Sequence, residues 1–137
     1  MKTMKELFLE FAKKQGVTTN DLGAVVQVAA AGKNGKWISN IQPIEEERLM
    51  VFNSILGIQV PEEKRATTAL LLTKLNYSVK VGAFQINPEN GEIAFRTTHF
   101  IFEGNDEAAE ELVGKLTLMS FSVIDTYYEE IQNVVER

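Results

Sequence analysis

Residues 75–96, LNYSVKVGAFQINPENGEIAFR, predict the end of a helix followed by a β-hairpin. Pro88 favours the φ angle of the first corner of a turn, and Asn90 and Gly91 both tolerate a positive φ. Residues 88–91 are therefore expected to form a four-residue loop between two strands.

The apolar residues on either side of this loop indicate the register of the hairpin. Side chains alternate between the two faces of a strand, so a sheet covered on one side needs its apolar residues on the same face. Counting outward from the loop gives the pairs Asn87–Glu92, Ile86–Ile93 and Phe84–Phe95. The four apolar members of these pairs share one face, which we expect to build the core.

Asn76 stands where the helix before the hairpin is expected to end. Asparagine accepts the left-handed backbone conformation, and its side-chain amide can bond to nearby backbone groups. We therefore expect Asn76 to stop the helix and to direct the strand that follows.

Composition limits the classes of function. The chain has 137 residues, so we expect one domain over residues 1–137. It contains no cysteine, which excludes disulfides, cysteine-ligated zinc and thiol catalysis. With 19 acidic and 14 basic residues its net charge is −5, which argues against nucleic acid and anionic membranes as partners, because both need a basic surface. No stretch has the pattern of a signal peptide or a transmembrane span, so a cytoplasmic protein is expected.

The first half of the chain predicts a helix followed by a hairpin. Thr3 and Glu6 have the spacing of a capping box at the start of a helix over residues 4–15. Asn34-Gly35 is a strong hairpin signal, although the alanines at 29–31 favour a helix. Treating Asn34-Gly35 as a two-residue turn gives the pairs Gly32–Trp37, Ala30–Ser39 and Val28–Ile41, and it places Val26, Val28, Trp37 and Ile41 on one face.

A charged turn and a third strand follow this hairpin. Residues 45–47 are all glutamate and are expected to be solvated. Residues 49–56 predict a strand, and their nearly continuous apolarity indicates that both of its faces are at least partly covered.

The second half predicts a helix over residues 61–75, the hairpin, and a long final helix that ends near residue 134. The alternation of the last strand changes between Phe95 and Phe100. Either a bulge near Thr97 shifts the phase, or the second face of the sheet is also apolar and has a partner. The apolar positions of the final helix include Leu112, Leu116, Met119, Val123, Tyr127 and Ile131.

The predicted order is α-β-β-β-α-β-β-α. It corresponds to the α+β class, a single domain with an antiparallel sheet of about five strands and flanking helices.

Several of these residues resemble the YbjN-type proteins, whose fold is like that of type III secretion chaperones. The resemblance is carried by Leu75-Asn76, by GAFQIN at 82–87, by GEIAFR at 91–96, and by Asp125 and Tyr128 in the final helix. It covers most of the chain after about Val51. The resemblance implies a sheet flanked by helices, a tendency to dimerise, and a binding or regulatory role without known catalytic residues.

Candidate chemical groups are sparse. His99 is the only histidine, and a packing role suits it better than metal binding because no second histidine or cysteine accompanies it. Ser39, Ser54 and Ser120 lack the spacing of a nucleophile elbow, and residues 32–36 lack the spacing of a phosphate-binding loop. We therefore predict no catalytic, cofactor-binding or metal-binding residue.

The leading functional hypothesis is a non-enzymatic, chaperone-like or regulatory module that forms a homodimer and holds a protein client. Aromatic and methionine side chains give such surfaces a large and adaptable contact area. The alternatives are a small-ligand or enzymatic domain with a pocket between the sheet and the final helix, and a structural subunit of a larger assembly. The expected partner or dimer surface consists of Met50, Phe52, Arg96, Thr98, Phe100, Phe102, Tyr127 and Tyr128.

Overall fold

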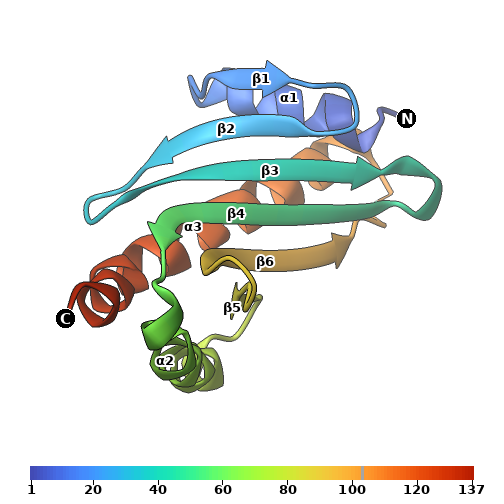
Figure 1. Cartoon of the computed structure of the whole chain (residues 1–137). Coiled ribbons are helices and arrows are strands. Elements are labelled where there is room, and N and C mark those ends of the chain that lie inside the picture. Colours follow the sequence, from blue (N-terminus) through green and yellow to red (C-terminus); the bar gives the residue numbers. More distant parts are fainter. Residues whose placement is uncertain (103) are drawn as a thin grey trace.

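A computed structural model describes residues 1–102 and 104–137, which form three α-helices and one six-stranded antiparallel sheet (Figure 1). The strands lie in the order β1-β2-β3-β4-β6-β5. In chain order the elements are α1 (Met4–Lys14), β1 (Thr19–Asp21), β2 (Val26–Ala31), β3 (Lys36–Ile44), β4 (Leu49–Gln59), α2 (Arg65–Ser78), β5 (Ala83–Ile86), β6 (Glu92–Phe100) and α3 (Asp106–Glu136). The predicted α+β class and element order are confirmed, with β1 as an additional short strand at the edge.

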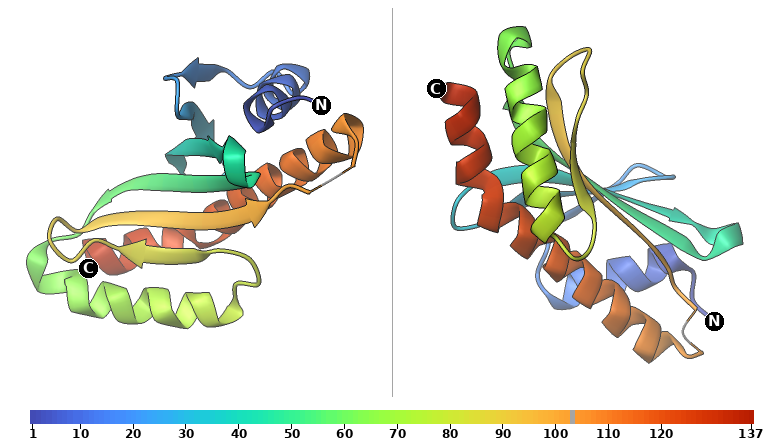
Figure 2. Two further views of the ribbon diagram at one scale, coloured as in Figure 1. Left: turned by 90° about the vertical axis from the view of Figure 1, so that its right-hand side faces the viewer. Right: turned by 90° about the horizontal axis from the view of Figure 1, so that it is seen from below.

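The helices leave one face of the sheet uncovered. Figure 1 looks onto this uncovered face, with α1 and α3 behind the strands. Helix α2 lies beside β5 at one edge of the sheet and also contacts α3. Figure 2 shows the twist of the sheet and the diagonal course of α3 across its back.

The core between the sheet and the helices consists of two apolar clusters. The first includes residues of α1 and the beginning of α3, and the second includes residues of α2 and the end of α3. In β3, β4, β6 and α3, buried serine and threonine residues separate the side chains of the first cluster from those of the second. We call these residues the hydroxyl belt. The belt consists of Ser39, Ser54, Thr97, Thr117 and Ser120.

The start of α1 is held by two sets of side chains. The predicted capping box is confirmed, because Thr3 Oγ1 accepts from the Glu6 N–H and the Glu6 carboxylate accepts from the Thr3 N–H. Glu45 was expected in a solvated turn, but its carboxylate accepts from the N–H groups of Met4 at 2.9 Å and Lys5 at 3.2 Å. It therefore caps a helix that begins 41 residues earlier in the chain.

The first hairpin has the predicted faces but a different register. Val28 pairs with Ser39 instead of Ile41, and Gly32 and Gly35 close a turn over Lys33 and Asn34. Each expected partner is displaced by two residues, which preserves the face to which every side chain points. The expected core residues Val26, Val28, Trp37 and Ile41 are accordingly all buried.

The second hairpin has the predicted register, with Ile86 opposite Ile93 and Phe84 opposite Phe95. The expectation for the preceding helix was partly wrong, because α2 continues past Asn76 to Ser78 and Asn76 has no positive φ. The Asn76 side chain instead accepts from the Phe84 N–H at 2.8 Å and donates to the Phe84 carbonyl oxygen at 2.9 Å. Asn76 thus fixes β5 to α2, which agrees with the expectation that this residue directs the strand after the helix.

The long final helix buries Leu116 and Ile131, two of the apolar positions expected from the sequence, but the rest of its buried line differs from those positions. Val113, Ser120, Ile124 and Tyr128 are buried, whereas Met119, Val123 and Tyr127 lie half-buried on the flank of the helix. Small residues occupy the close contacts of this helix. A Cβ atom on Gly114, for example, would lie 2.7 Å from the Phe11 ring.

Candidate functional site

The uncovered side of the sheet, called here the open face, is the candidate site. It is made by the outward side chains of the six strands, on the side away from α1 and α3. The alternation of β6 continues without a bulge to Phe100, so the second of the two explanations for its pattern is correct and the outer side of the sheet is partly apolar.

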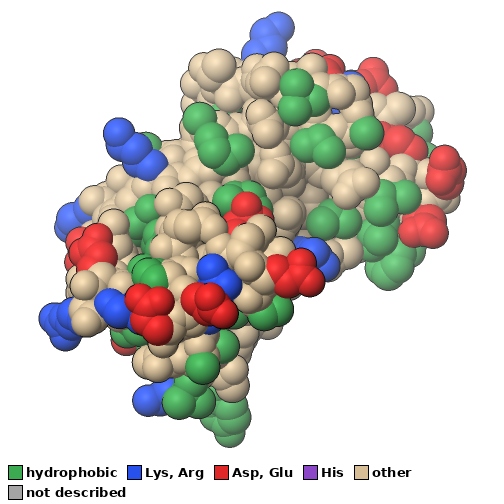
Figure 3. All heavy atoms as spheres, in the orientation of Figure 1, with side chains coloured by type: hydrophobic (Ala, Val, Ile, Leu, Met, Phe, Trp, Pro, Cys, Tyr) green, Lys and Arg blue, Asp and Glu red, His purple; other side chains and the backbone are tan. Residues whose placement is uncertain are grey.

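The open face has few charged side chains. On their outward side the strands carry Lys36, Glu92 and Arg96 as charged residues and seven amides, together with apolar residues such as Ile38, Val51 and Ile55. Figure 3, in the same view as Figure 1, shows mostly uncharged surface over β3 and β4. The amides are Asn20, Gln27, Asn40, Gln42, Asn53, Gln59 and Gln85.

One line of polar residues crosses the open face from strand to strand. The strand register places neighbouring members of this line directly opposite one another, from β1 to β6. We call this line the amide row; it consists of Asn20, Gln27, Asn40, Asn53 and Arg96. Sequence reasoning missed it, because the line depends on the register between strands that are far apart in the chain.

Two members of the amide row have unsatisfied hydrogen-bonding groups. The side-chain carbonyl oxygens of Asn40 and Asn53 are shielded from solvent and have no hydrogen-bond partner among the described residues. A shielded polar atom without a partner destabilises a protein by about 1–3 kcal/mol. The centre of the open face, between β3 and β4, therefore has unused capacity for hydrogen bonding.

One end of the open face carries exposed aromatic side chains. The rings of Phe100 and Phe102 stack at a centroid distance of 5.2 Å. They are 55% and 74% exposed, although phenylalanine is ordinarily buried. Leu49, opposite Phe100, and Ile44, opposite Leu49, continue this apolar end across the sheet.

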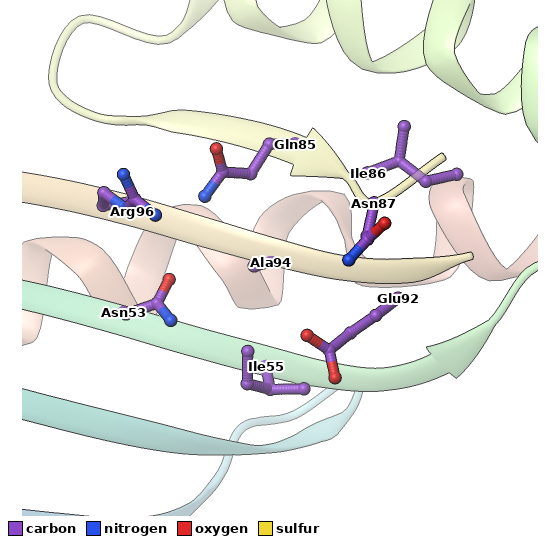
Figure 4. Close-up of a pocket in the computed structure, with 8 residues that line it drawn as sticks. All are labelled: Asn53, Ile55, Gln85, Ile86, Asn87, Glu92, Ala94 and Arg96. Carbon is purple, nitrogen blue, oxygen red and sulfur yellow. The ribbon is translucent and has the colours of Figure 1, made fainter. Parts of the chain in front are cut away.

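A shallow hollow lies on the other half of the open face. It has a volume of about 270 Å³ and is bounded mainly by polar side chains (Figure 4). Gln85, Arg96 and Asn53 lie there on three successive strands, β5, β6 and β4. Its lining is completed by Ile55, Ile86, Asn87, Glu92 and Ala94.

The structure divides the eight expected surface residues into two groups. Arg96, Thr98 and Phe100 are exposed on the open face, and Phe102 is exposed just beyond β6. The other four do not belong to this face. They are Met50, Phe52, Tyr127 and Tyr128.

Three of these four side chains are buried inside the chain and cannot form a partner surface as expected. Met50 and Phe52 point from β4 into the core, and the Tyr128 hydroxyl donates to the Leu56 carbonyl oxygen at 3.0 Å. Tyr127 is half-buried and packs edge-on against Phe84. The apolar run in β4 could not reveal which of its two sides faces the core.

A cavity between the sheet and the final helix, as the ligand-binding alternative requires, is small. A partly open pocket bounded by α1, α3 and β2 has a volume of about 140 Å³, with Phe8, Phe11 and Phe121 in its wall. Pockets for metabolites commonly measure about 300–1,000 Å³. This pocket is smaller than that range, which weighs against the ligand-binding alternative.

Two further observations concern metals and membranes. Within the described residues, no three His, Cys, Asp or Glu side chains come together in a way that could hold a metal ion. In the same residues, no helix combines the length and the apolarity needed to cross a membrane.

The chain is similar to a known protein family and to a solved structure. A family model named YbjN, described as "Putative bacterial sensory transduction regulator", matches residues 7–133. A solved structure described as "Crystal structure of YbjN, a putative transcription regulator from E. coli" is similar with a TM-score of 0.64 and 12% identity, over 92% of each chain. That identity shows a common fold alone. No curated protein matches the chain. Because the family model spans nearly all of the sequence, this chain belongs to the YbjN family.

Proposed function

We propose that this chain is a non-enzymatic regulatory module that forms a homodimer and binds protein partners through its open face. The observation that carries the proposal is the composition of that face, where amides and apolar residues outnumber three charged side chains. Depletion of charge and exposure of aromatic residues are the features that distinguish protein interfaces from other surfaces. The description of the family as a regulator supports the same class of function and a cytoplasmic place of action.

The exposed members of the expected surface give the proposal its contact residues. Phe100 and Phe102 offer apolar area, and Arg96 offers five hydrogen-bond donors beside Thr98. A chaperone-like module would bind its client through the same groups, because an apolar side chain of a peptide can pack against a stacked aromatic pair at the end of a sheet.

Light scattering over micromolar concentrations, with and without a charge on the open face, tests the homodimer. Thr98→Arg places a second cation beside Arg96 and should weaken association by about ten-fold or more, because it would bury a charge without a partner at the interface. Thr67→Arg, on the exposed side of α2, is the matched control and should associate like the wild type. A wild-type protein that stays monomeric at every concentration would refute the homodimer.

Affinity capture tests the client. The wild type and the Thr67→Arg variant should retain the same protein from native extract, whereas Thr98→Arg should lose it. A thermal-shift screen with metabolites tests the alternative, a small-ligand function. Stabilisation by one metabolite, without any protein that distinguishes the variants, would favour a small-ligand function instead.

A further inference from the structure

We infer that the open face binds a second copy of this chain face to face, with the two-fold axis running along the strands between β3 and β4. This arrangement rests on the homodimer proposed above and specifies its geometry. The amide row carries the argument, because its chemistry and its order across the sheet limit how two copies can meet.

Electrostatics favours the open face as the place where two copies approach. Each chain carries a net charge of −5, so two copies repel each other over most orientations. The open face, in contrast, carries Lys36 and Arg96 against Glu92 alone. Two copies that meet through this face keep most of their acidic side chains outside the contact, so the repulsion between them is smaller than in other orientations.

The amides make the face complementary to itself. In a two-fold dimer the same patch contributes from both sides, so groups near the axis meet their own kind. Carboxylates only accept hydrogen bonds and ammonium groups only donate, whereas an amide does both. The carbonyl oxygens of Asn40 and Asn53, which have no partner in the described part of the chain, lie at the middle of the six strands. Rotation of either side chain there would present its amide to a second copy.

The order of the amide row distinguishes the two directions that the axis can take. An axis along the row would place each member against itself, and Arg96 of one copy would face Arg96 of the other. An axis along the strands reverses the row, so that Asn40 faces Asn53 and Gln27 faces Arg96. The second arrangement gives the guanidinium an amide oxygen instead of another cation.

The same axis also matches the neighbouring rows. Ile38 and Ile55 are opposite each other in the sheet, so the axis along the strands brings Ile38 of one copy onto Ile55 of the other. Lys36 precedes Ile38 by two residues, and Glu92 precedes Ala94, the neighbour of Ile55 on β6, by two residues. Glu92 therefore comes close to Lys36 of the second copy. Apolar residues meet apolar residues, and the opposite charges approach each other.

The sheet edges are poor alternatives to this face. At the β5 edge, the outward N–H and carbonyl groups of Phe84 are already bonded to the Asn76 side chain. At the other edge, β1 is three residues long. Short or covered edge strands oppose pairing with another chain, so face-to-face packing is favoured.

Cross-linking through introduced cysteines tests the axis, because the chain has no cysteine of its own. Gln27→Cys and Arg96→Cys chains are co-expressed with different tags and treated with a short bis-maleimide. Packed sheets lie about 10 Å apart, and residues three strands away are displaced by roughly a further 14 Å. The mixed dimer should therefore cross-link roughly ten-fold or more better than either variant alone, because its thiols are held together.

Further variants separate the possible outcomes. Asn40→Cys with Asn53→Cys is the second mixed pair, and Tyr77→Cys, 96% exposed on α2, reports random collisions. Efficient cross-linking of Arg96→Cys with itself would overturn the inference in favour of the axis along the row. Dimers by light scattering without any cross-link above the Tyr77→Cys level would overturn the face-to-face arrangement and leave the homodimer standing. Monomers by light scattering would refute the homodimer and this inference together.

Discussion

Asn76 illustrates how one side chain can take the place of a neighbouring strand. Its amide makes both hydrogen bonds that a further strand would make with Phe84 at the β5 edge. The residue lies in α2, so the same two bonds also hold the helix against the hairpin. An amide is required, because only an amide offers a donor and an acceptor side by side.

Replacing Asn76 with alanine should destabilise the protein. Two backbone groups of Phe84 would lose their partner, which corresponds to about 1–3 kcal/mol of unfolding free energy. Urea unfolding measures the loss, and hydrogen exchange should show faster exchange at the Phe84 amide. Asn76→Asp is the informative comparison, since its carboxylate can still accept from the Phe84 N–H but cannot donate to the carbonyl. Equal stability of all three proteins would contradict the assigned role.

His99 provides a pH test at the same scale. Burial lowers the pKa of His99 below its ordinary value of 6.5, and Nε2 lies 2.8 Å from Thr97 Oγ1. As the pH is lowered, His99 is therefore protonated at a higher pH in the unfolded chain than in the folded chain. The unfolding free energy should fall as the pH falls through 6.5 toward the lowered pKa. Urea unfolding between pH 7.5 and pH 5.5 should show a loss that the His99→Gln variant lacks. An identical pH dependence in the variant would exclude His99 as the source.

At the scale of elements, the hydroxyl belt marks where α3 crosses the sheet. Ser39 and Ser54 lie on adjacent strands with their hydroxyl oxygens 2.6 Å apart, beneath a helix whose buried positions there are small. Ser120 Oγ in α3 has no partner among the described residues. Small side chains allow a helix to approach a sheet closely, and the hydroxyl groups must then find partners within the core.

The serines of the belt should respond differently to alanine. Ser54→Ala leaves the Ser39 hydroxyl buried without its partner and should lower the unfolding free energy by about 1–3 kcal/mol. Ser120→Ala removes a hydroxyl that bonds to none of the described residues, so it should be neutral or slightly stabilising. Urea unfolding of both variants and of the Ser39→Ala/Ser54→Ala double variant checks this. A large loss in Ser120→Ala would show that its hydroxyl has a partner, such as a buried water.

At the scale of the whole molecule, most of the charged side chains lie away from the open face. A net charge of −5 keeps copies apart, while the open face carries only three charged side chains. Association through such a face is opposed by long-range repulsion and supported by short-range contacts. Added salt screens the first and leaves the second largely intact.

Self-association should therefore strengthen with ionic strength. The dissociation constant of the dimer, measured by sedimentation or light scattering, should fall when sodium chloride is raised from low to moderate concentration. Two Lys36–Glu92 contacts would weaken under the same conditions, but exposed ion pairs contribute only about 0–1 kcal/mol each. A dimer that dissociates on adding salt would indicate an interface dominated by ion pairs and located elsewhere on the surface.

The sequence by itself determined the class of fold, most element positions and the register of the second hairpin. These depend on local signals: capping side chains, the alternation of apolar residues, and the loop over residues 88–91. Membership of the YbjN family also followed from sequence motifs, whereas the likeness to type III secretion chaperones stays a prediction. Of the expected surface, Arg96, Thr98 and Phe100 could be placed because their outward positions follow from strand alternation.

Only the tertiary structure decided the turn of the first hairpin, the inward side of β4 and the amide row. The turn shows the reason most directly. The Asp125 carboxylate of α3 accepts from the N–H groups of Lys33 and Asn34, and a Cβ atom on Gly32 would lie 2.1 Å from it. Asn34-Gly35 favours a turn wherever it stands in a chain, but its register here is set by a helix about ninety residues away. Contacts at such distances in sequence depend on how the elements pack, and local propensity cannot specify them.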